Sequence, residues 1–366
     1  MRNTNVKRIL AALLSAVMIS VLIPAAALAD DPQPGTQAPD ITVYLTVSDE
    51  GQIAADRDGK PMAWREVTAS DLNEDGYVTF DEALRAAHVT FCPEGVAGLD
   101  INETSGWVNM LWGKTSAAGY SFIRNNKAEM SMVTDTVLSE GDHLTASLNT
   151  DTTLYADWNA YFDKYEVKAG TNEKVKLTLA GYQAMTVNTP APAKNAAVGI
   201  WEEGVFTKKA DTDENGAVSL TFDKAGTYIV TAQGTVSDMV YDWSQGQETA
   251  ADCPLIAPVC VVKVTLSAAD RAKAAQVKGL KVTAGKKKAT VRWTKNTKVF
   301  SGYQVYYKQA GKSAKKVKIN KKSAASKVIK KLTSKKRYTF KVRGFAKADG
   351  RTVYGKWSAS KTVKIK

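Results

Sequence analysis

The sequence predicts a multidomain, mainly β protein, in which a mixed β domain with one short helix is followed by two β-sandwiches. Beyond residue 40, apolar and polar residues alternate with period two in many short runs, such as residues 41–48. One amphipathic helix pattern is clear, over residues 81–88. The chain has 366 residues, which is long enough for several ordinary hydrophobic cores. These observations favour β domains arranged one after another.

Residues 1–29 have the features of a signal peptide. Basic residues precede an apolar run over residues 9–23, and Ala27-Leu28-Ala29 supplies a small-x-small cleavage site before Asp30. The apolar run is short for a membrane span, and no later segment approaches about 18 consecutive apolar residues. We therefore expect a secreted chain with no membrane span in its mature form, with a linker over residues 30–40.

The first domain is predicted to cover residues 41–162. Strands are expected at residues 41–48, 62–67, 120–123 and 143–148, because these runs alternate and are bounded by turn residues. The single helix pattern contains Ala83, Leu84 and Ala87 at helical spacing. It begins at the end of an acidic loop, which carries the clearest chemical signal in the sequence.

That loop has side-chain oxygens at alternate positions, a glycine at its sixth position and a glutamate at its twelfth, which is the ligand pattern of a calcium loop. The predicted ligands are Asp71, Asn73, Asp75, the carbonyl of Tyr77, Thr79 through a water, and Glu82 through both oxygens. Ca²⁺ is favoured over Mg²⁺ because Mg²⁺ demands six tightly held ligands. An acidic turn that holds no ion is the alternative.

The loop resembles an EF-hand. Because the segment before it, residues 62–70, is predicted to be a strand, the resemblance is greater to the single loops of dockerins and other bacterial surface proteins than to a paired sensor. This implies a structural Ca²⁺ outside the cell, bound with a dissociation constant of about 10⁻⁴ to 10⁻³ M.

Residues 107–113, 120–126 and 140–144 resemble a domain of secreted bacterial proteins that is similar to the C-terminal domain of transcobalamin. The resemblance implies a β-rich fold, which in transcobalamin helps to cover a corrinoid. The larger helical corrin-binding domain has no counterpart in this sequence. For a small ligand such as a corrinoid or a glycan, the expected stacking surface is Trp107, Trp112, Tyr120 and Trp158, although large aromatic side chains are more often part of a core.

The second domain is predicted over residues 163–266, as a β-sandwich of short strands joined by glycine-containing turns. Residues 211–222 begin like a second calcium loop, but Phe222 occupies the position of the bidentate glutamate, so Asn215-Gly216 is predicted to be a hairpin turn. Residues 212–232 resemble bacterial immunoglobulin-like surface repeats. Cys253 and Cys260 are close enough in sequence to form a disulfide, and the alternative is that both lie unbridged in or beside a strand.

A linker is expected over residues 267–276, followed by a third domain over residues 277–366 with evenly spaced strands. Trp293, Leu332, Tyr338 and residues 354–358 match the pattern of a fibronectin type III domain, which this segment resembles. The resemblance implies a two-sheet sandwich in which Trp293 is in the core and the hydroxyl of Tyr338 bonds to the preceding loop.

Charge is divided steeply along the chain. Residues 271–366 contain 31 of the 50 Lys and Arg but only one of the 37 acids, Asp349, which leaves 19 basic and 36 acidic residues in residues 1–270. A basic domain of this kind is expected to bind a polyanion. For a secreted chain this is an anionic cell-wall polymer or an acidic glycan and not a nucleic acid. Lys outnumbers Arg, which suits a diffuse polyanion.

No catalytic motif is found in the sequence. The chain has two histidines, His88 and His143, which we expect to be surface or half-buried residues, and neither a nucleophile elbow nor a His-Glu-x-x-His zinc motif. The sequence therefore predicts a non-enzymatic binding or adhesion protein, secreted and retained at a bacterial cell surface. The acidic domains are expected to bind a protein or glycan partner that the sequence does not identify.

Overall fold

A computed structural model describes residues 35, 37–183, 189–348 and 350–366. The predicted signal peptide lies outside this part of the chain. The described part contains 27 strands, two α-helices and one 3₁₀ helix, so the prediction of a mainly β protein is confirmed. No helix in these ranges is both long enough and apolar enough to cross a membrane. The strands form three successive units, each with its own hydrophobic core.

The first unit has a sheet with the strand order β2-β1-β8-β6-β7, and β3 also pairs with β1. β1 and β8 are parallel, which is unexpected for an alternating sequence. Helix α1 (Phe80–Thr90) packs Ala83, Leu84 and Ala87 into the core, which confirms the predicted helix. The other elements are β1 (Ile41–Asp49), β2 (Gln52–Ile53), β3 (Arg65–Ala69), η1 (Gly95–Gly98), β4 (Asp100–Ile101), β5 (Val108–Met110), β6 (Tyr120–Arg124), β7 (Lys127–Ala128) and β8 (His143–Leu148).

The second unit consists of two sheets, with the orders β10-β19-β16-β13-β14 and β12-β11-β9-β18-β17, and β15 pairs with β11. Their strands are β9 (Trp158–Phe162), β10 (Glu166–Gly170), β11 (Lys174–Gln183), β12 (Ala191–Pro192), β13 (Ala197–Glu202), β14 (Val205–Asp211), β15 (Ala217–Thr221), β16 (Gly226–Gln233), β17 (Thr235–Asp242), β18 (Gln247–Ile256) and β19 (Cys260–Thr265). β9 was expected at the end of the first domain, but it pairs with β11 and β18. Its side chains therefore belong to the second core.

Cys253 and Cys260 are buried in the second core as free thiols, and Cys92 is buried in the first. Burial raises the pKa of the thiols of Cys253 and Cys260 to about 12, so both remain protonated at neutral pH. The unbridged alternative is the one that the structure shows. The two thiols contribute as small apolar side chains.

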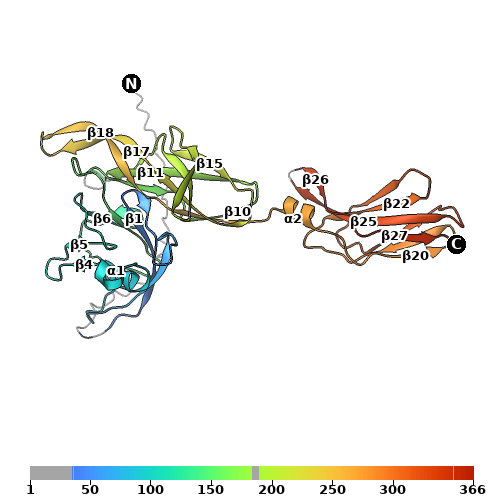
Figure 1. Cartoon of the computed structure of the whole chain (residues 1–366), viewed down its shortest axis with the longest axis horizontal. Helices are drawn as coiled ribbons and strands as arrows, with labels where there is room; N and C mark the ends of the chain where they lie inside the picture. The colour runs from blue at the N-terminus through green and yellow to red at the C-terminus, as the bar shows by residue number, and fades with distance from the viewer. Residues whose placement is uncertain (1–34, 36, 184–188, 349) are drawn as a thin grey trace, which may run out of the picture.

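The first and second units lie side by side (Figure 1). They share a small apolar cluster. Ile53 and Ala63 from the first unit pack there against Trp201, Ala257 and Val259 from the second. Hydrogen bonds reinforce this junction. The indole of Trp64 donates to the carbonyl of Val259 at 3.0 Å, and the N–H of Ala257 donates to the hydroxyl of Ser48 at 3.1 Å.

The predicted linker contains a short helix, α2 (Ala268–Ala274), with Ser267 as its N-cap. Asp270 in this helix accepts hydrogen bonds from Thr171 at 2.6 Å and Asn172 at 3.3 Å, in the turn between β10 and β11. Ala272 is fully buried in the core of the third unit. The helix is therefore attached to both neighbouring units and is more than a spacer.

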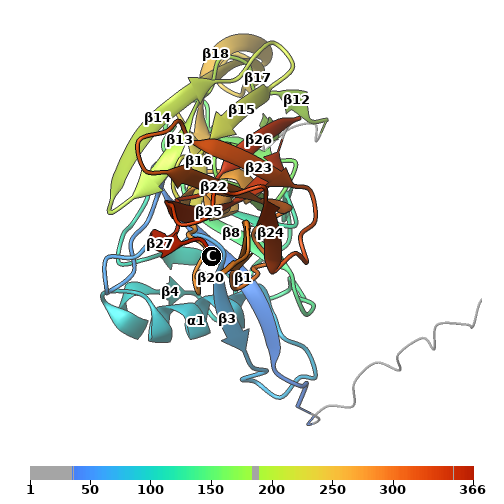
Figure 2. The same ribbon diagram turned by 90° about the vertical axis from the view of Figure 1, so that its right-hand side faces the viewer.

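The third unit lies at the far end of the molecule, beyond α2 in Figure 1, and Figure 2 looks onto this end. Its two sheets have the orders β20-β21-β24 and β23-β22-β25-β26, and β27 pairs with β25. As expected, Trp293 is in the core, and the hydroxyl of Tyr338 accepts from the N–H of Thr333 at 3.1 Å. The strands are β20 (Lys281–Gly285), β21 (Lys288–Arg292), β22 (Gly302–Gln309), β23 (Lys315–Ile319), β24 (Ser326–Lys330), β25 (Arg337–Ala348), β26 (Arg351–Tyr354) and β27 (Lys361–Lys364).

His88, expected at or near the surface, is fully buried. Its Nδ1 lies 2.7 Å from the carbonyl oxygen of Leu84, and its Nε2 accepts from the N–H of Trp112 at 3.1 Å. This arrangement requires a neutral ring that donates from Nδ1. Burial lowers the pKa of His88, although the Leu84 carbonyl and the charge of Glu94 oppose the shift. The side chain joins α1 to the segment after β5.

The burial of His88 predicts that the stability of the first unit depends on pH. Because the folded pKa is lowered, the unfolded chain binds a proton first, near its ordinary value of about 6.5, and stability is lost as the pH falls below that value. Burial also lowers the pKa of His143, so both histidines act in the same direction. We expect the denaturant midpoint of the first unit to fall between pH 7.5 and pH 5.5.

The matched variant is His88→Gln. It should be less stable at pH 7.5, by about 1–3 kcal/mol for the lost buried hydrogen bonds, but its midpoint should change less with pH. Denaturation followed by tryptophan fluorescence at both pH values measures this. An unchanged pH dependence in the variant would show that His88 is not the titrating group.

Candidate functional site

The predicted calcium loop lies between β3 and α1, and its first residue, Asp71, is fully buried. Oδ2 of Asp71 accepts from the N–H groups of Ala38 at 2.8 Å and Gly76 at 2.9 Å, and Oδ1 accepts from that of Asp75 at 3.2 Å. Gly76 has a φ of 91°, a conformation that suits glycine and produces the sharp turn expected there. The carboxylate of Asp71 thus organises the turn around itself.

Asn73 and Asp75 are exposed and bond mainly to the loop itself. The amide of Asn73 donates to Oδ2 of Asp75 at 2.9 Å, and Oδ1 of Asp75 accepts from the N–H of Tyr77 at 2.9 Å. The bond between Tyr77 and Asp75 is an Asx turn, and both short-range bonds rigidify the loop. They also keep the side chains of Asn73 and Asp75 within the turn that Asp71 organises.

Glu82 is buried and closes the loop. Its Oε1 accepts from the N–H of Leu72 at 2.6 Å, and its Oε2 accepts from the N–H of Thr79 at 2.8 Å and from the hydroxyl of Thr79 at 3.0 Å. Thr79 is the N-cap of α1, and Thr79 and Glu82 together form a capping box. Thr79 was expected to hold a water on the metal, and its role as a cap was missed, although the Thr-x-x-Glu spacing signals a capping box.

Burial favours the neutral form of Asp71, but the backbone N–H groups of Ala38, Gly76, Asp75 and Glu74 outweigh it, so the pKa of Asp71 is lowered. Asp71 is therefore ionised at neutral pH. Within the described ranges, no three His, Cys, Asp or Glu side chains are grouped closely enough to hold a metal ion. The oxygen donors suit Ca²⁺, whereas ligation by both oxygens of Glu82 would have to replace its bonds to Leu72 and Thr79.

The expected aromatic stacking surface is not formed. Trp112 and Trp158 are 6% and 1% exposed and lie in different cores, and the indole of Trp112 donates to the carbonyl of Ala55 at 2.9 Å. Tyr120 is half-buried and donates to the carbonyl of Asn109 at 2.8 Å. Trp107 alone of the four is exposed. This part of the prediction was wrong because burial, and not the presence of a ring, decides what can stack on a ligand.

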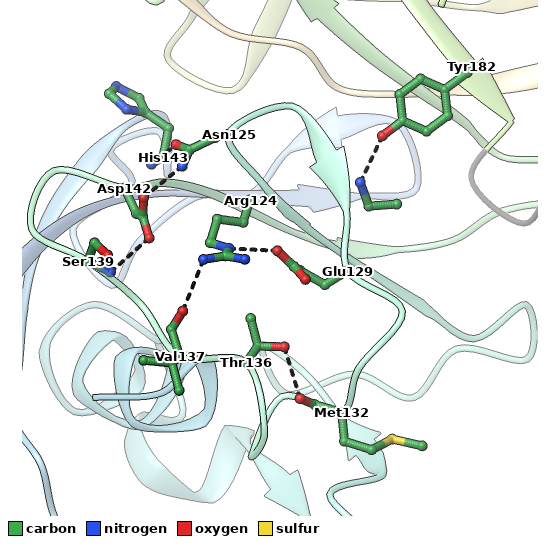
Figure 3. Close-up of polar contacts among 11 residues, drawn as sticks. Arg124, Asn125, Glu129, Met132, Thr136, Val137, Ser139, Asp142, His143 and Tyr182 are labelled. Carbon is green, nitrogen blue, oxygen red and sulfur yellow. Dashed lines mark hydrogen bonds and ion pairs between the residues drawn. The ribbon is translucent and has the colours of Figure 1, made fainter. Parts of the chain in front are cut away.

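Sequence reasoning missed a polar network beside the second unit, drawn in Figure 3. Asn125 donates to Oδ1 of Asp142 at 2.7 Å and accepts from the N–H of His143 at 3.0 Å, and the hydroxyl of Tyr182 accepts from the N–H of Ala128 at 2.8 Å. A surface hollow of about 650 Å³ adjoins this network. Its lining residues are Asn125, Asn126, Lys127, Ala128, Tyr161, Tyr182 and Pro190.

The ring of His143 is stacked between those of Tyr165 and Tyr44, at centroid distances of 3.8 and 4.8 Å. Tyr165 precedes β10 of the second unit, whereas Tyr44 and His143 belong to the first. His143 is half-buried, as expected, and it joins the two units.

The third unit shows the expected excess of positive charge. Lys273 and Asp270, both in α2, form an ion pair with N and O 3.0 Å apart. Beyond Lys273, no ion pair is found among the residues that the structure describes. The cations beyond Lys273 therefore have no ion-pair partner among the described residues.

The sequence model of the fibronectin type III domain matches residues 275–360, so the third unit contains such a domain. No curated protein matches the chain. Similar solved structures include the FN1–FN3 domains of chicken CNTN1, with 14% identity over 62% of this chain and 72% of that one and a TM-score of 0.25. The FN5 domain of Drosophila Lar has 16% identity over 25% of this chain and 96% of its own, with a TM-score of 0.21. An FN3 domain of human collagen XX has 19% identity over 24% and 90%, with a TM-score of 0.20.

A fibronectin type III domain is typical of binding and adhesion proteins outside the cell, and such β-sandwiches are typically not catalytic. This agrees with the function class that the sequence predicts.

The calcium loop leads to a direct test. Ca²⁺ should raise the melting temperature of the first unit, because an ion that binds only the folded state stabilises it, by about 2.7 kcal/mol at a hundredfold excess over the dissociation constant. Glu82→Gln should abolish this response, since the variant loses the ionised ligand. Gln keeps the reciprocal bond of the capping box, so the variant should still fold.

Glu74→Gln is the matched control, because it makes the same charge change at an exposed position of the same loop. It should retain the response to Ca²⁺. Differential scanning calorimetry of the full chain in Ca²⁺ and in chelator gives the comparison. A first unit of the wild type that melts identically in both would exclude the site.

Proposed function

We propose that this chain is a non-enzymatic, secreted protein that is retained at a bacterial cell surface. Its basic fibronectin type III domain docks on an anionic cell-wall polymer or an acidic glycan. The observation that carries this proposal is the excess of positive charge in residues 271–366, where 31 Lys and Arg accompany one acid. Unpaired cations on one domain attract a polyanion through counterion release and direct Coulomb attraction.

The arrangement of the units supports this function. The basic domain lies at one end of the molecule and the acidic units lie at the other, so a docked domain leaves the acidic units projecting from the surface (Figure 1). The junction between the first two units makes them one platform for a protein or glycan partner. The hollow beside Tyr161 and Tyr182 favours a small glycan as the second candidate ligand, bound by the acidic units.

Ca²⁺ has a structural role in this proposal. Asp71, Asn73, Asp75, Tyr77, Thr79 and Glu82 would hold it on the loop before α1, where it would neutralise the loop's carboxylates. The buried, ionised carboxylate of Asp71 supports this role, because its charge has no cationic side chain among its hydrogen-bond partners. The ion would lock the first unit and would take no part in docking.

The docking can be tested with the full chain on purified bacterial cell walls. We expect binding at 0.1 M NaCl and release at 1 M, because the Debye length falls from about 10 Å to about 3 Å over this range. Walls stripped of anionic polymer are the control and should bind weakly at both concentrations. Retention that does not change with salt concentration would contradict electrostatic docking.

A further inference from the structure

The two sheets of the third unit expose different outer faces. In the sheet β23-β22-β25-β26, cross-strand pairing places Tyr306 beside Lys316 on one side and Lys341 on the other. In the same way it places Gln304 between Lys318 and Arg343. Paired residues point to the same side of a sheet, so two rows of basic side chains flank Tyr306 and Gln304.

The opposite sheet, β20-β21-β24, has cations on its outer face without aromatic rings. Lys288 pairs with Lys330, and Lys281 pairs with Arg292. Between them are Thr283, Thr290, Val328 and Ser326. The two faces therefore have similar charge and differ in their aromatic content, which allows one to serve as the control for the other.

Arg343 is held in a fixed position on the aromatic face. Its guanidinium carbon lies 3.9 Å from the ring centroid of Tyr354 and 4.4 Å from that of Trp357. Oε1 of Gln304 accepts from its Nε at 3.0 Å and from its Nη2 at 2.8 Å. Because these contacts restrict the side chain, little further entropy is lost when it binds an anion.

These contacts do not use all the N–H donors of the Arg343 guanidinium. A guanidinium has five N–H groups, of which Gln304 uses two, and no described residue accepts a hydrogen bond from Nη1. Arg343 is half-buried, so part of its side chain is open to solvent. A planar fork of this kind matches a sulfate or carboxylate group.

Tyr306 adds a flat apolar surface beside this cation. It is half-buried, and its ring meets that of Trp357 edge to face with centroids 5.7 Å apart. The negative face of an aromatic ring attracts the slightly positive C–H groups of a sugar ring. Neighbouring strands are about 4.8 Å apart, so Lys316 and Lys341 lie close enough to reach acidic groups of the same chain of sugars.

We propose that this face, formed by Tyr306, Lys316, Lys318, Lys341, Arg343 and Trp357, binds an acidic polysaccharide. A sugar ring stacks on Tyr306, and a sulfate or carboxylate group bonds to Arg343. The inference rests on the proposed docking function and narrows it. The cations select a polyanion, and the aromatic rings select one built from sugar rings over a ring-free polyol phosphate.

The test measures binding of the full chain by isothermal titration calorimetry at fixed salt concentration, with heparin and with poly(glycerol phosphate) as probes. Lys316, Lys318 and Lys341 are changed together to Gln, and the control changes Lys281, Lys288 and Lys330 together to Gln. Both variants lose three positive charges. We expect the first to weaken heparin binding about tenfold or more and the second about twofold, because charged hydrogen bonds are lost only in the first.

Two single variants test the recognition itself. Arg343→Lys keeps the charge but loses the fork, and it should weaken heparin binding about tenfold, whereas Arg292→Lys on the opposite sheet should not. Tyr306→Leu should weaken heparin binding and leave poly(glycerol phosphate) binding unchanged. A melting curve for each variant confirms that it is folded.

The outcomes separate the two proposals. If the wild type binds neither polymer, electrostatic docking fails, and the inference fails with it. If it binds but the two triple variants lose affinity equally, docking stands and the assignment to this face is overturned. The polysaccharide assignment is overturned if poly(glycerol phosphate) binds as tightly as heparin and its binding responds to Tyr306→Leu in the same way. The same result with duplex DNA would also overturn it.

Discussion

The third unit folds against the mutual repulsion of its own cations, and its apolar core provides the opposing force. Lys288 and Lys330 are directly opposite each other in neighbouring strands, a placement that destabilises a sheet. Trp293, Tyr303 and Phe340 are buried beneath the strands, and burial of such aromatic side chains contributes several kcal/mol. Beyond Lys273 the described residues form no ion pair that would relieve this repulsion.

The three units are joined by specific contacts between neighbouring units. The first two share an apolar cluster and the stack of Tyr44, His143 and Tyr165. Asp270 bonds to the second unit, while Ala272 packs in the third. Gly355 allows the close approach of α2, because a Cβ there would lie 2.7 Å from the carbonyl oxygens of Ala272 and Ala275.

Glu82 joins two parts of the acidic loop before α1. Glu82 caps α1 through Thr79 and also bonds to Leu72 at the beginning of the loop. A carboxylate has more acceptor positions than these bonds use, so its chemistry suits both a helix cap and a cation ligand. One fixed geometry of Glu82 would not serve both roles. Asp71 differs, because its backbone donors hold it ionised inside the fold. The loop is therefore a stable turn whose charge suits a cation.

The sequence alone determined features that depend on neighbouring residues: the helix after the acidic loop, strand β8 at its observed residues, and the charge division of the chain. The hydrogen bond between Tyr338 and Thr333 was expected from the resemblance of residues 277–366 to a fibronectin type III domain. Only the tertiary structure decided that β9 joins the second sheet, that His88 is buried, and that Arg343 lies between Tyr354 and Trp357. Alternation and helical spacing show which side of an element is apolar, but not which distant segment covers it. That choice is made by pairing and packing across the whole chain.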